Sequence, residues 1–418
     1  MSQPKKLQNL TNLQDRTVRS SLAGTCAGRV KPWQVEDCAP RTPARPLYAV
    51  DGWFLTQRIS GIQRYAIEIL AELDRQIPAG SVEIVLPEGA PQPVYDNIRV
   101  VVQGQANPLW EQRDYPRYLA GAGRRWLCMC NVIPLHSPDA CRGIAVWHDV
   151  CYRARPDFYR DPRGRASAAW HRLQYRAMAA RARRIVTVSE FSKTEIERYY
   201  GVPGERITVI YNAWQHMQRV AADESIFAGA GKWPALRPGR YYFSMANLLK
   251  NKNFPWVLRA AKNTPEAVFA IAGGGSLQAE ARSLGLAELP NVVYLGYVTD
   301  EEAKALMAHC RAFLFPTLYE GFGIPPLEAI ACGAPAVLVS DTPCMREIYG
   351  PHAGYIDLAA NPGNLRQITP PAADPAAVLN RYAWRESARR LAGLMGLDRK
   401  STRLNSSHKD TSRMPSSA

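Results

Sequence analysis

The sequence has no run of apolar residues long enough to cross a membrane. Among its 418 residues the longest apolar stretches, such as Trp126–Leu135, are short and end at a proline or a charged residue. A spanning helix needs about 20 mostly apolar residues, so the sequence excludes one. The N-terminal segment also lacks the apolar core of a secretory signal, and we expect no export by that route.

Cysteine is scarce and irregularly placed. The nine cysteines are odd in number and lack the spacing of a disulfide framework. Cys128 and Cys130 are too close together for the usual zinc or redox pair. The pattern therefore indicates a reducing compartment, and we expect a cytoplasmic protein.

Acidic residues are too few to balance the basic ones, and the net charge is +15. The excess is greatest in Arg113–Arg184, which has fifteen arginines, no lysine and five acids. Such a charge favours a polyanionic partner. The sequence has no zinc finger, RNP-type aromatic strand or basic zipper, so we do not expect nucleic acid as a partner. We favour nucleotide phosphates or an anionic membrane surface as the partner.

Length and composition indicate a globular protein of two or three domains. Hydrophobic residues make up 46% and charged residues 21%, and a domain has roughly 150 residues. Residues 1–45 are polar and without apolar periodicity, so we predict an unstructured extension. Residues 398–418 break the preceding pattern, and we predict an unstructured tail that is not native to the protein.

Strand-like runs alternate with amphipathic stretches in two successive parts of the chain, 46–220 and 241–377. A Gly- and Pro-containing linker, 221–240, separates them. The alternation predicts the α/β class, with two facing Rossmann-like domains and an interdomain cleft. A last helical run, Val378–Leu397, is predicted to cross back onto the first domain. The predicted strands are Leu47–Asp51, Val82–Leu86, Ile98–Val102, Trp126–Cys130, Ile144–Trp147, Ile185–Val188, Ile207–Tyr211, Tyr241–Met245, Ala267–Ala272, Val292–Leu295, Ala312–Phe315 and Ala336–Val339.

The most informative motif, Pro316–Gly333, contains two glutamates, Glu320 and Glu328. It begins where a strand-like run ends, and ligand sites of α/β proteins form there. Its Gly-Phe-Gly turn lets backbone amides approach a ligand, and Pro325 and Pro326 predict a helix whose amino end favours an anion. One sugar and one ribose would satisfy both carboxylates. For a lone glutamate pair, the alternative is a surface loop whose acids complement the helix dipole.

This stretch resembles the signature of the family 4 retaining glycosyltransferases, and the resemblance extends over about residues 47–350. It implies the GT-B fold, and it implies that the two glutamates bind the transferred sugar and the nucleotide ribose. We expect catalysis to involve Glu320, and we expect a donor-binding role for the remaining motif positions. These positions are Gly321, Phe322, Gly323, Ile324 and Glu328.

Other segments resemble the same family. Lys252, in a Lys-Asn motif, is expected to contact the donor diphosphate and to act in catalysis, and Lys250 is a candidate second cation. Gly61 lies in a segment that resembles the family's glycine loop beside the donor phosphates. His148 ends a strand in a segment that resembles the family's His-Asp element near the transferred sugar, and we expect it to act in catalysis, although a lone histidine is usually structural.

The resemblance implies a metal-independent hexosyltransferase that needs no cofactor, because the nucleotide sugar is a substrate. The expected partners are this donor and a glycan or lipid-linked acceptor of surface-polysaccharide or lipopolysaccharide biosynthesis. GDP-mannose is the favoured donor, and UDP-hexose and dTDP-rhamnose remain open. A nucleotide-sugar epimerase of the same fold and an inactive sugar-binding module are the alternatives from other classes.

Four arginines are predicted to share one face of a helix. Read at 100° per residue, they fall within about 20° of one line. They would form either a solvated basic face or a patch for the anionic inner face of the membrane. They are Arg165, Arg172, Arg176 and Arg183. An adjacent face, which includes Trp170 and Leu173, is predicted to pack on the sheet.

Overall fold

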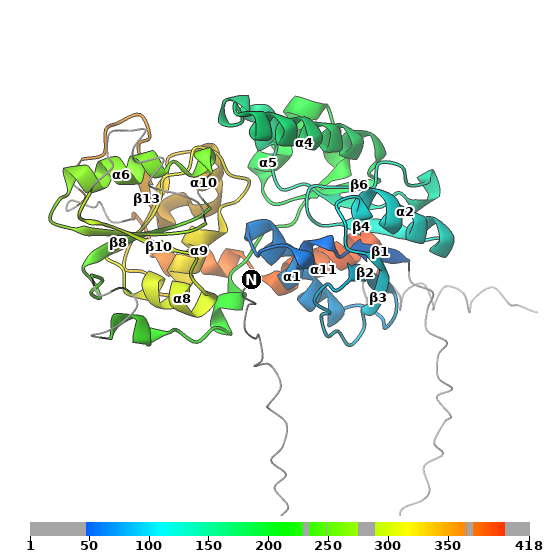
Figure 1. Ribbon diagram of the computed structural model, residues 1–418, viewed down its shortest axis with the longest axis horizontal. Coiled ribbons are helices and arrows are strands. Elements are labelled where there is room, and N and C mark those ends of the chain that lie inside the picture. Colours follow the sequence, from blue (N-terminus) through cyan, green and yellow to red (C-terminus); the bar gives the residue numbers. More distant parts are fainter. Residues whose placement is uncertain are drawn as a thin grey trace, which may run out of the picture. The chain divides into compact units, whose positions relative to one another are not determined.

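The computed structural model describes residues 47–228, 233, 235–247, 249–274, 289–363, 365 and 371–397 (Figure 1). The extension predicted at 1–45 and the tail predicted at 398–418 lie outside these residues. Two parallel β-sheets with helices on both faces account for most of the described chain. The predicted pair of Rossmann-like α/β domains is therefore confirmed.

The first sheet has seven parallel strands in the order β3-β2-β1-β4-β5-β6-β7. The strands are β1 (Tyr48–Asp51), β2 (Val82–Glu88), β3 (Arg99–Gln105), β4 (Arg125–Cys128), β5 (Ile144–Val146), β6 (Arg184–Thr187) and β7 (Ile207–Val209). The helices between them are α1 (Gly61–Asp74), α2 (Trp110–Ala122), α3 (Cys151–Ala154), α4 (Pro162–Arg181) and α5 (Glu190–Tyr200).

Apolar residues on both sides of the central strands explain why this sheet is covered on two faces. Successive residues point to opposite faces of a strand. On β4, Leu127 packs in the cluster that contains α1, whereas Trp126 packs with α2 and α4. On β5, Val146 packs in the cluster that contains α1, and Ala145 packs in the cluster that contains α2 and α4. Continuous apolar runs of this kind are typical of parallel sheets buried on both sides.

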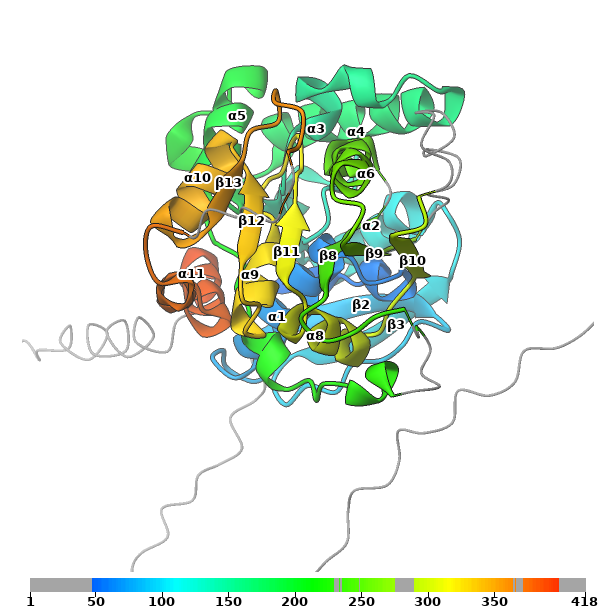
Figure 2. The same ribbon diagram turned by 90° about the vertical axis from the view of Figure 1, so that its left-hand side faces the viewer.

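The second sheet has six parallel strands in the order β10-β9-β8-β11-β12-β13, which Figure 2 shows side by side. Its strands are β8 (Tyr241–Met245), β9 (Val268–Ala272), β10 (Val292–Gly296), β11 (Ala312–Phe315), β12 (Val337–Ser340) and β13 (Gly354–Ile356). The described helices are α6 (Phe254–Asn263), α8 (Asp300–Ala308), α9 (Ile324–Ala331) and α10 (Pro343–Tyr349).

Strand order reverses once in each sheet, and this positions the candidate site. Chain connections leave β1 and β4 in opposite directions in the first sheet, and β8 and β11 do the same in the second. Ligands of open α/β sheets bind at such switch points, beyond the carboxyl ends of the strands. The Lys-Asn motif follows β8 and the glutamate motif follows β11, so the topology brings the two motifs to one sheet edge.

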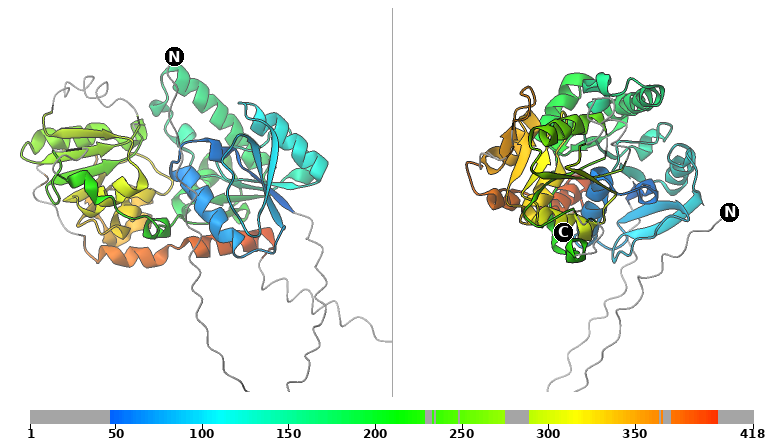
Figure 3. Two further views of the ribbon diagram at one scale, coloured as in Figure 1. Left: turned by 60° about the horizontal axis from the view of Figure 1, so that its bottom comes forward. Right: turned by 60° about the vertical axis from the view of Figure 1, so that its left-hand side comes forward.

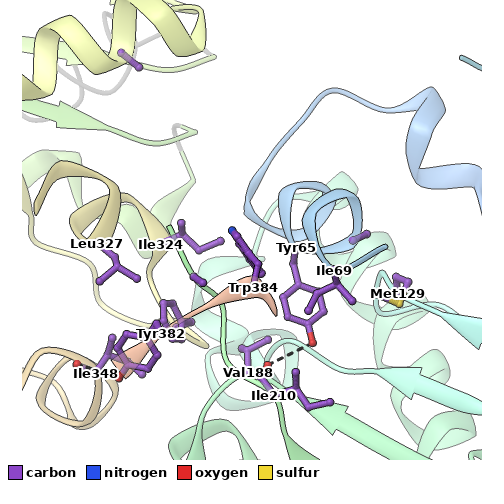
Figure 4. Packing of buried hydrophobic residues seen from close by; sticks show 14 of the residues in the cluster. Tyr65, Ile69, Met129, Val188, Ile210, Ile324, Leu327, Ile348, Tyr382 and Trp384 are labelled. Atoms are coloured by element: carbon purple, nitrogen blue, oxygen red, sulfur yellow. Dashed lines mark hydrogen bonds between the residues drawn. The ribbon is translucent and has the colours of Figure 1, made fainter. Parts of the chain in front are cut away.

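The C-terminal helix is shorter than predicted. The run predicted at Val378–Leu397 divides into a 3-10 helix, Pro375–Arg381, and helix α11, Trp384–Met395. Helix α11 packs against α1 of the first domain (Figure 3). Tyr65 of α1 lies with its ring 5.9 Å from that of Trp384, and its hydroxyl donates to the Ile210 carbonyl oxygen at 3.3 Å (Figure 4). No described helix is both long and apolar enough to span a membrane.

Candidate functional site

An ion pair between two predicted site residues lies at the centre of the second domain's sheet edge. Lys252 Nζ lies 2.6 Å from Glu320 Oε1, and the two side chains are only 17% and 12% exposed. Lys252 belongs to the 3-10 turn after β8, and Glu320 to the loop after β11. The structure thus brings together two residues that the sequence separates by 68 positions.

Two asparagines tie the lysine turn to the glutamate loop. Asn251 Nδ2 donates to the Tyr319 carbonyl oxygen at 3.2 Å, and the Asn251 carbonyl accepts from the Leu318 amide at 2.7 Å. Asn253 Nδ2 donates to the Pro316 carbonyl oxygen at 3.0 Å. Asn253 has a φ of +54°, a left-handed conformation that asparagine tolerates better than most residues. These bonds fix Lys252 relative to Glu320.

Burial and opposite charge act against each other in this cluster. Burial raises the pKa of Glu320, and the Lys252 ammonium opposes that rise. Burial also raises the pKa of Asp149, again opposed by Lys252. Lys252 therefore stabilises the charge of two carboxylates and is the cation that a phosphate entering this edge would meet. Within the described ranges, no group of three or more His, Cys, Asp or Glu residues is placed to hold a metal ion.

Gly321 makes a close contact between the two domains. A Cβ atom at Gly321 would lie 2.1 Å from the His148 carbonyl oxygen, so no side chain fits there. The Gly321 carbonyl accepts from Ser189 Oγ at 2.6 Å and from Ser192 Oγ at 3.2 Å. Both serines open α5 of the first domain. Glycine is also favoured at position 323, because the backbone there has a φ of +82°, a left-handed conformation that residues with a side chain rarely adopt.

His148 is buried and electrically neutral. Its Nε2 lies 2.8 Å from the Met129 carbonyl oxygen, so Nε2 carries the proton. Burial lowers the pKa of His148 to about 4. Asn131 Oδ1 accepts from the His148 amide at 2.8 Å and holds the end of the strand in place. At neutral pH His148 therefore brings no positive charge to the site, and only its neutral ring can act there.

Glu328 accepts a hydrogen bond from a histidine that sequence reasoning did not identify. His216 Nε2 lies 2.7 Å from Glu328 Oε1, and the Trp384 indole N–H donates to His216 Nδ1 at 3.2 Å. Because Nδ1 accepts a hydrogen bond, the proton of the neutral ring is on Nε2 and points to Glu328. Neither His216 nor Trp384 lies in a motif, and only their low exposure of 2% marks them as unusual.

The remaining predicted residues differ in what they can contact. Gly61 begins α1, and a Cβ there would lie 3.7 Å from Ile324 Cδ1, so the glycine loop adjoins the start of α9. Ile324 is 6% exposed. Phe322 is 3% exposed and packs against Tyr382, so its backbone rather than its ring is available to a donor. Lys250 is exposed and makes no contact with Glu320 within the described part of the chain.

The arginine stripe differs from its prediction in two ways. Helix α4 ends at Arg181, so Arg183 is not on the helix with the other three arginines. Trp170 and Leu173 do not pack on the sheet; they are 39% and 48% exposed. The buried residues of α4 are Ala168, Gln174, Tyr175 and Met178. Packing of Tyr175 on Trp147, with ring centroids 4.9 Å apart, determines which face is buried.

A pair of buried carboxylates near the end of β1 should make stability depend on pH. Burial raises the pKa of Asp51 to about 6, against the opposing effect of its hydrogen bonds with the Trp53 amide and with Glu111. Burial, the charge of Asp51 and the hydrogen bond with Asp51 raise the pKa of Glu111 to about 9. In the unfolded chain both carboxyls release their protons near the ordinary carboxyl pKa. In the folded protein Asp51 and Glu111 keep their protons to higher pH. Stability is therefore present at low pH and is lost as pH rises towards 9.

We expect Glu111→Gln to remove most of this loss. The amide still donates to Asp51 but has no proton to release, so at pH 9 the variant should be more stable by on the order of 1 kcal/mol or more. Urea unfolding at pH 5, 7 and 9 measures the free energy of unfolding, and Glu88→Gln, at an exposed glutamate, is the control. Equal pH slopes in wild type and Glu111→Gln would show that Glu111 titrates normally.

Two family models match the chain, one in each domain. "Glycosyltransferase Family 4" matches residues 59–214, and "Glycosyl transferases group 1" matches residues 232–364. Together the two matches extend over more than half of the sequence and contain Gly61, His148, Lys252, Glu320 and Glu328.

Curated relatives and solved structures agree with these models. The O-antigen chain mannosyltransferase B of Escherichia coli is 28% identical over 298 residues, which are 67% of this chain and 70% of that protein. The O-antigen chain mannosyltransferase RfbU of Salmonella typhimurium is 29% identical over 218 residues, 50% of this chain and 55% of that protein.

Among solved structures, Anabaena Alr3699/HepE, in complex with UDP and glucose, has a TM-score of 0.62 at 15% identity. The match covers 84% of this chain and 99% of that one. WaaG, a glycosyltransferase involved in lipopolysaccharide biosynthesis, has a TM-score of 0.55 at 17% identity, over 86% of this chain and 99% of that one. The two sheets thus have the GT-B arrangement, and the chain belongs to the family 4 glycosyltransferases.

Proposed function

We propose that this enzyme transfers a mannosyl residue from GDP-mannose to a glycan or lipid-linked acceptor of surface-polysaccharide synthesis, with retention of configuration. The observation that carries the proposal is the ion pair of Lys252 with Glu320 at the switch point of the second sheet. The mannosyltransferase relatives support the choice of mannose. The peripheral membrane role and the cytoplasmic location belong to the same proposal.

In the proposed reaction the departing diphosphate needs charge stabilisation, and Lys252 supplies it. On donor binding the ammonium group exchanges part of its contact with Glu320 for a phosphate oxygen. The carboxylate of Glu320 is then available to the hydroxyls of the transferred sugar. Preorganised charge of this kind acts without reorganisation during the reaction. The acceptor attacks from the face that the diphosphate leaves, and the leaving phosphate oxygen takes the acceptor proton.

The proposed chemistry requires little acid–base work from the protein. His148 is neutral at pH 7, with Nε2 committed to the Met129 carbonyl oxygen. It would orient the sugar rather than exchange protons. Positioning of donor and acceptor, rather than proton transfer by a side chain, then supplies the rate.

A donor panel tests the proposal. Purified enzyme is given GDP-mannose, a UDP-hexose or dTDP-rhamnose with a lipid-linked oligosaccharide, and the released nucleoside diphosphate is measured. The proposal predicts release from GDP-mannose that depends on acceptor, and an α-linked product detected by NMR. Donor consumption without acceptor would indicate an epimerase or hydrolase. Donor binding without turnover under every condition would indicate a sugar-binding module.

The membrane part of the proposal has its own prediction. Exposed Trp170 and Leu173 lie on the same helix as Arg165, Arg172 and Arg176, a combination typical of helices that bind a membrane surface. Each arginine near an anionic surface contributes about 1 kcal/mol. We expect sedimentation with phosphatidylglycerol vesicles at low salt and release as salt rises. The comparison is a variant with Gln in place of Arg165, Arg172, Arg176 and Arg183. If wild type and this variant sediment equally, the arginines form a solvated face and do not bind the membrane.

A further inference from the structure

A pocket of about 400 Å³ opens on the first domain and is lined by basic and aromatic residues. Its lining comes from three helices: Arg153 from α3, Arg172 and Arg176 from α4, and Tyr199 and Tyr200 from the end of α5. No lining residue is acidic. The volume is in the range of small-molecule sites, and the three guanidinium groups make it a site for an anion.

The arginines are held by neighbouring groups but not neutralised. Arg172 Nε donates to the Tyr152 carbonyl oxygen at 2.9 Å. The Arg153 guanidinium lies 5.9 Å from the centre of the Tyr199 ring. Neither these two nor Arg176 forms an ion pair with a carboxylate in the described ranges. Three positive charges therefore face one pocket without a matching negative charge.

Tyr200 adds a neutral donor to the pocket. Its hydroxyl is buried and has no hydrogen-bond partner among the described residues. Burial raises the pKa of Tyr200 to about 12, and the charges of the three arginines that line the same pocket all oppose that rise. The ring is packed 4.9 Å from Trp147 and 5.9 Å from Tyr175. The hydroxyl is thus held in place to donate to an anion.

We propose that this pocket binds a phosphate or diphosphate group. Guanidinium groups recognise phosphate oxygens through paired N–H donors, and tyrosine adds one more. The pocket differs from the donor site: Ser189, which contacts Gly321, caps the start of helix α5, and Tyr200 ends that helix, about 16 Å away at 1.5 Å per residue.

The anion has two possible sources, the diphosphate of a lipid-linked acceptor and a phospholipid headgroup. We assign it to the acceptor, and that assignment rests on the proposed function. Leu173, three residues before Arg176 on α4, is a neighbour of that arginine on the helix surface, and Trp170 is the neighbour of Leu173 one turn further. Both are exposed and would contact an apolar chain attached to the phosphate. A separation of about 16 Å leaves room for sugars between the diphosphate and the transfer site.

Binding is tested without transfer, so that failure of the proposed function does not affect the result. Inorganic pyrophosphate is titrated by calorimetry into Lys252→Ala, which removes the donor-site cation. The same background then carries Arg153→Gln with Arg176→Gln. As a matched control it carries Arg165→Gln with Arg183→Gln, two arginines outside the pocket. All four substituted arginines are exposed, so each variant should fold, and thermal unfolding checks this.

We expect the pocket pair to weaken pyrophosphate binding at least tenfold and the control pair to change it less than twofold. A second arm measures sedimentation with phosphatidylglycerol and phosphatidylcholine vesicles. Weaker pyrophosphate binding in the pocket pair, with equal vesicle binding in the pocket pair and the control pair, supports a diphosphate of the acceptor type. Weaker phosphatidylglycerol binding in the pocket pair than in the control pair supports a headgroup and overturns the assignment to the acceptor. Equal pyrophosphate affinity in the pocket pair and its parent overturns the proposal.

Discussion

Replacing Lys252 with alanine is expected to lower the rate of glycosyl transfer by on the order of a hundredfold or more. Lys252 is fixed by Asn251 and Asn253 against the glutamate loop, and it is the cation that the donor diphosphate would meet. With this cation stabilising the leaving group, transfer should also persist in excess EDTA. The measurement is release of nucleoside diphosphate under saturating donor and acceptor, with and without EDTA.

Removal of Lys252 also leaves the buried Glu320 carboxylate without its partner, and this effect must be separated from catalysis. The double variant Lys252→Ala, Glu320→Gln removes that charge, so its thermal stability should recover while its rate stays low. Lys262→Ala, an exposed lysine at the end of α6, is the matched control. Lys250→Ala should lower the rate of glycosyl transfer less than Lys252→Ala does. A rate that recovers in the double variant, or an EDTA-silenced enzyme restored by magnesium, would contradict the assignment.

Most of the fold could be predicted because most of its strands are buried on both faces. Runs such as Ala312–Phe315 have no polar residue, and the observed β11 has the same bounds. Strand β13 was not predicted, since Gly354–Ile356 is only three residues long and follows a Gly- and Pro-containing turn. The length of α11 was overestimated because the 3-10 turn before it has similar apolar content.

The buried face of α4 could not be read from periodicity. Arginines and alanines occur around the whole helix, and large apolar residues lie on more than one side. Packing with Trp147, from another part of the chain, buries Tyr175 and leaves Trp170 exposed. A pattern within one helix contains no information about such a partner.

The sequence predicted which residues belong to the candidate site, but not which of them contact one another. Motif spacing identified Lys252, Glu320 and Glu328, yet which of them meet depends on how separate strands align. His216 is 112 residues from Glu328 in sequence, and no local signal links them. The role of Gly321 became clear only when the His148 carbonyl was found 2.1 Å from where a Cβ would be.

Glu328→Ala is expected to weaken nucleoside diphosphate binding roughly ten- to a hundredfold, because a charge-assisted contact to the ribose is worth about 1.5–3 kcal/mol. His216 already binds one carboxylate oxygen, which holds the other in a fixed direction for the ribose hydroxyls. Glu320→Ala should instead lower turnover with little effect on this affinity. Calorimetric titration of GDP into each variant separates the two roles.

The contribution of His216 can be separated by changing its other partner. Trp384→Phe removes the indole N–H, so His216 Nδ1 loses its donor and the ring no longer has a single preferred tautomer. GDP affinity should then fall by less than in Glu328→Ala, because the Glu328 carboxylate is still present but the ring that orients it is held less firmly. Glu301→Ala, an exposed acid of α8 in the same domain, is the control and should bind GDP normally. Wild-type affinity in Glu328→Ala would show that this carboxylate does not hold the ribose, and wild-type affinity in Trp384→Phe would show that His216 does not orient the carboxylate.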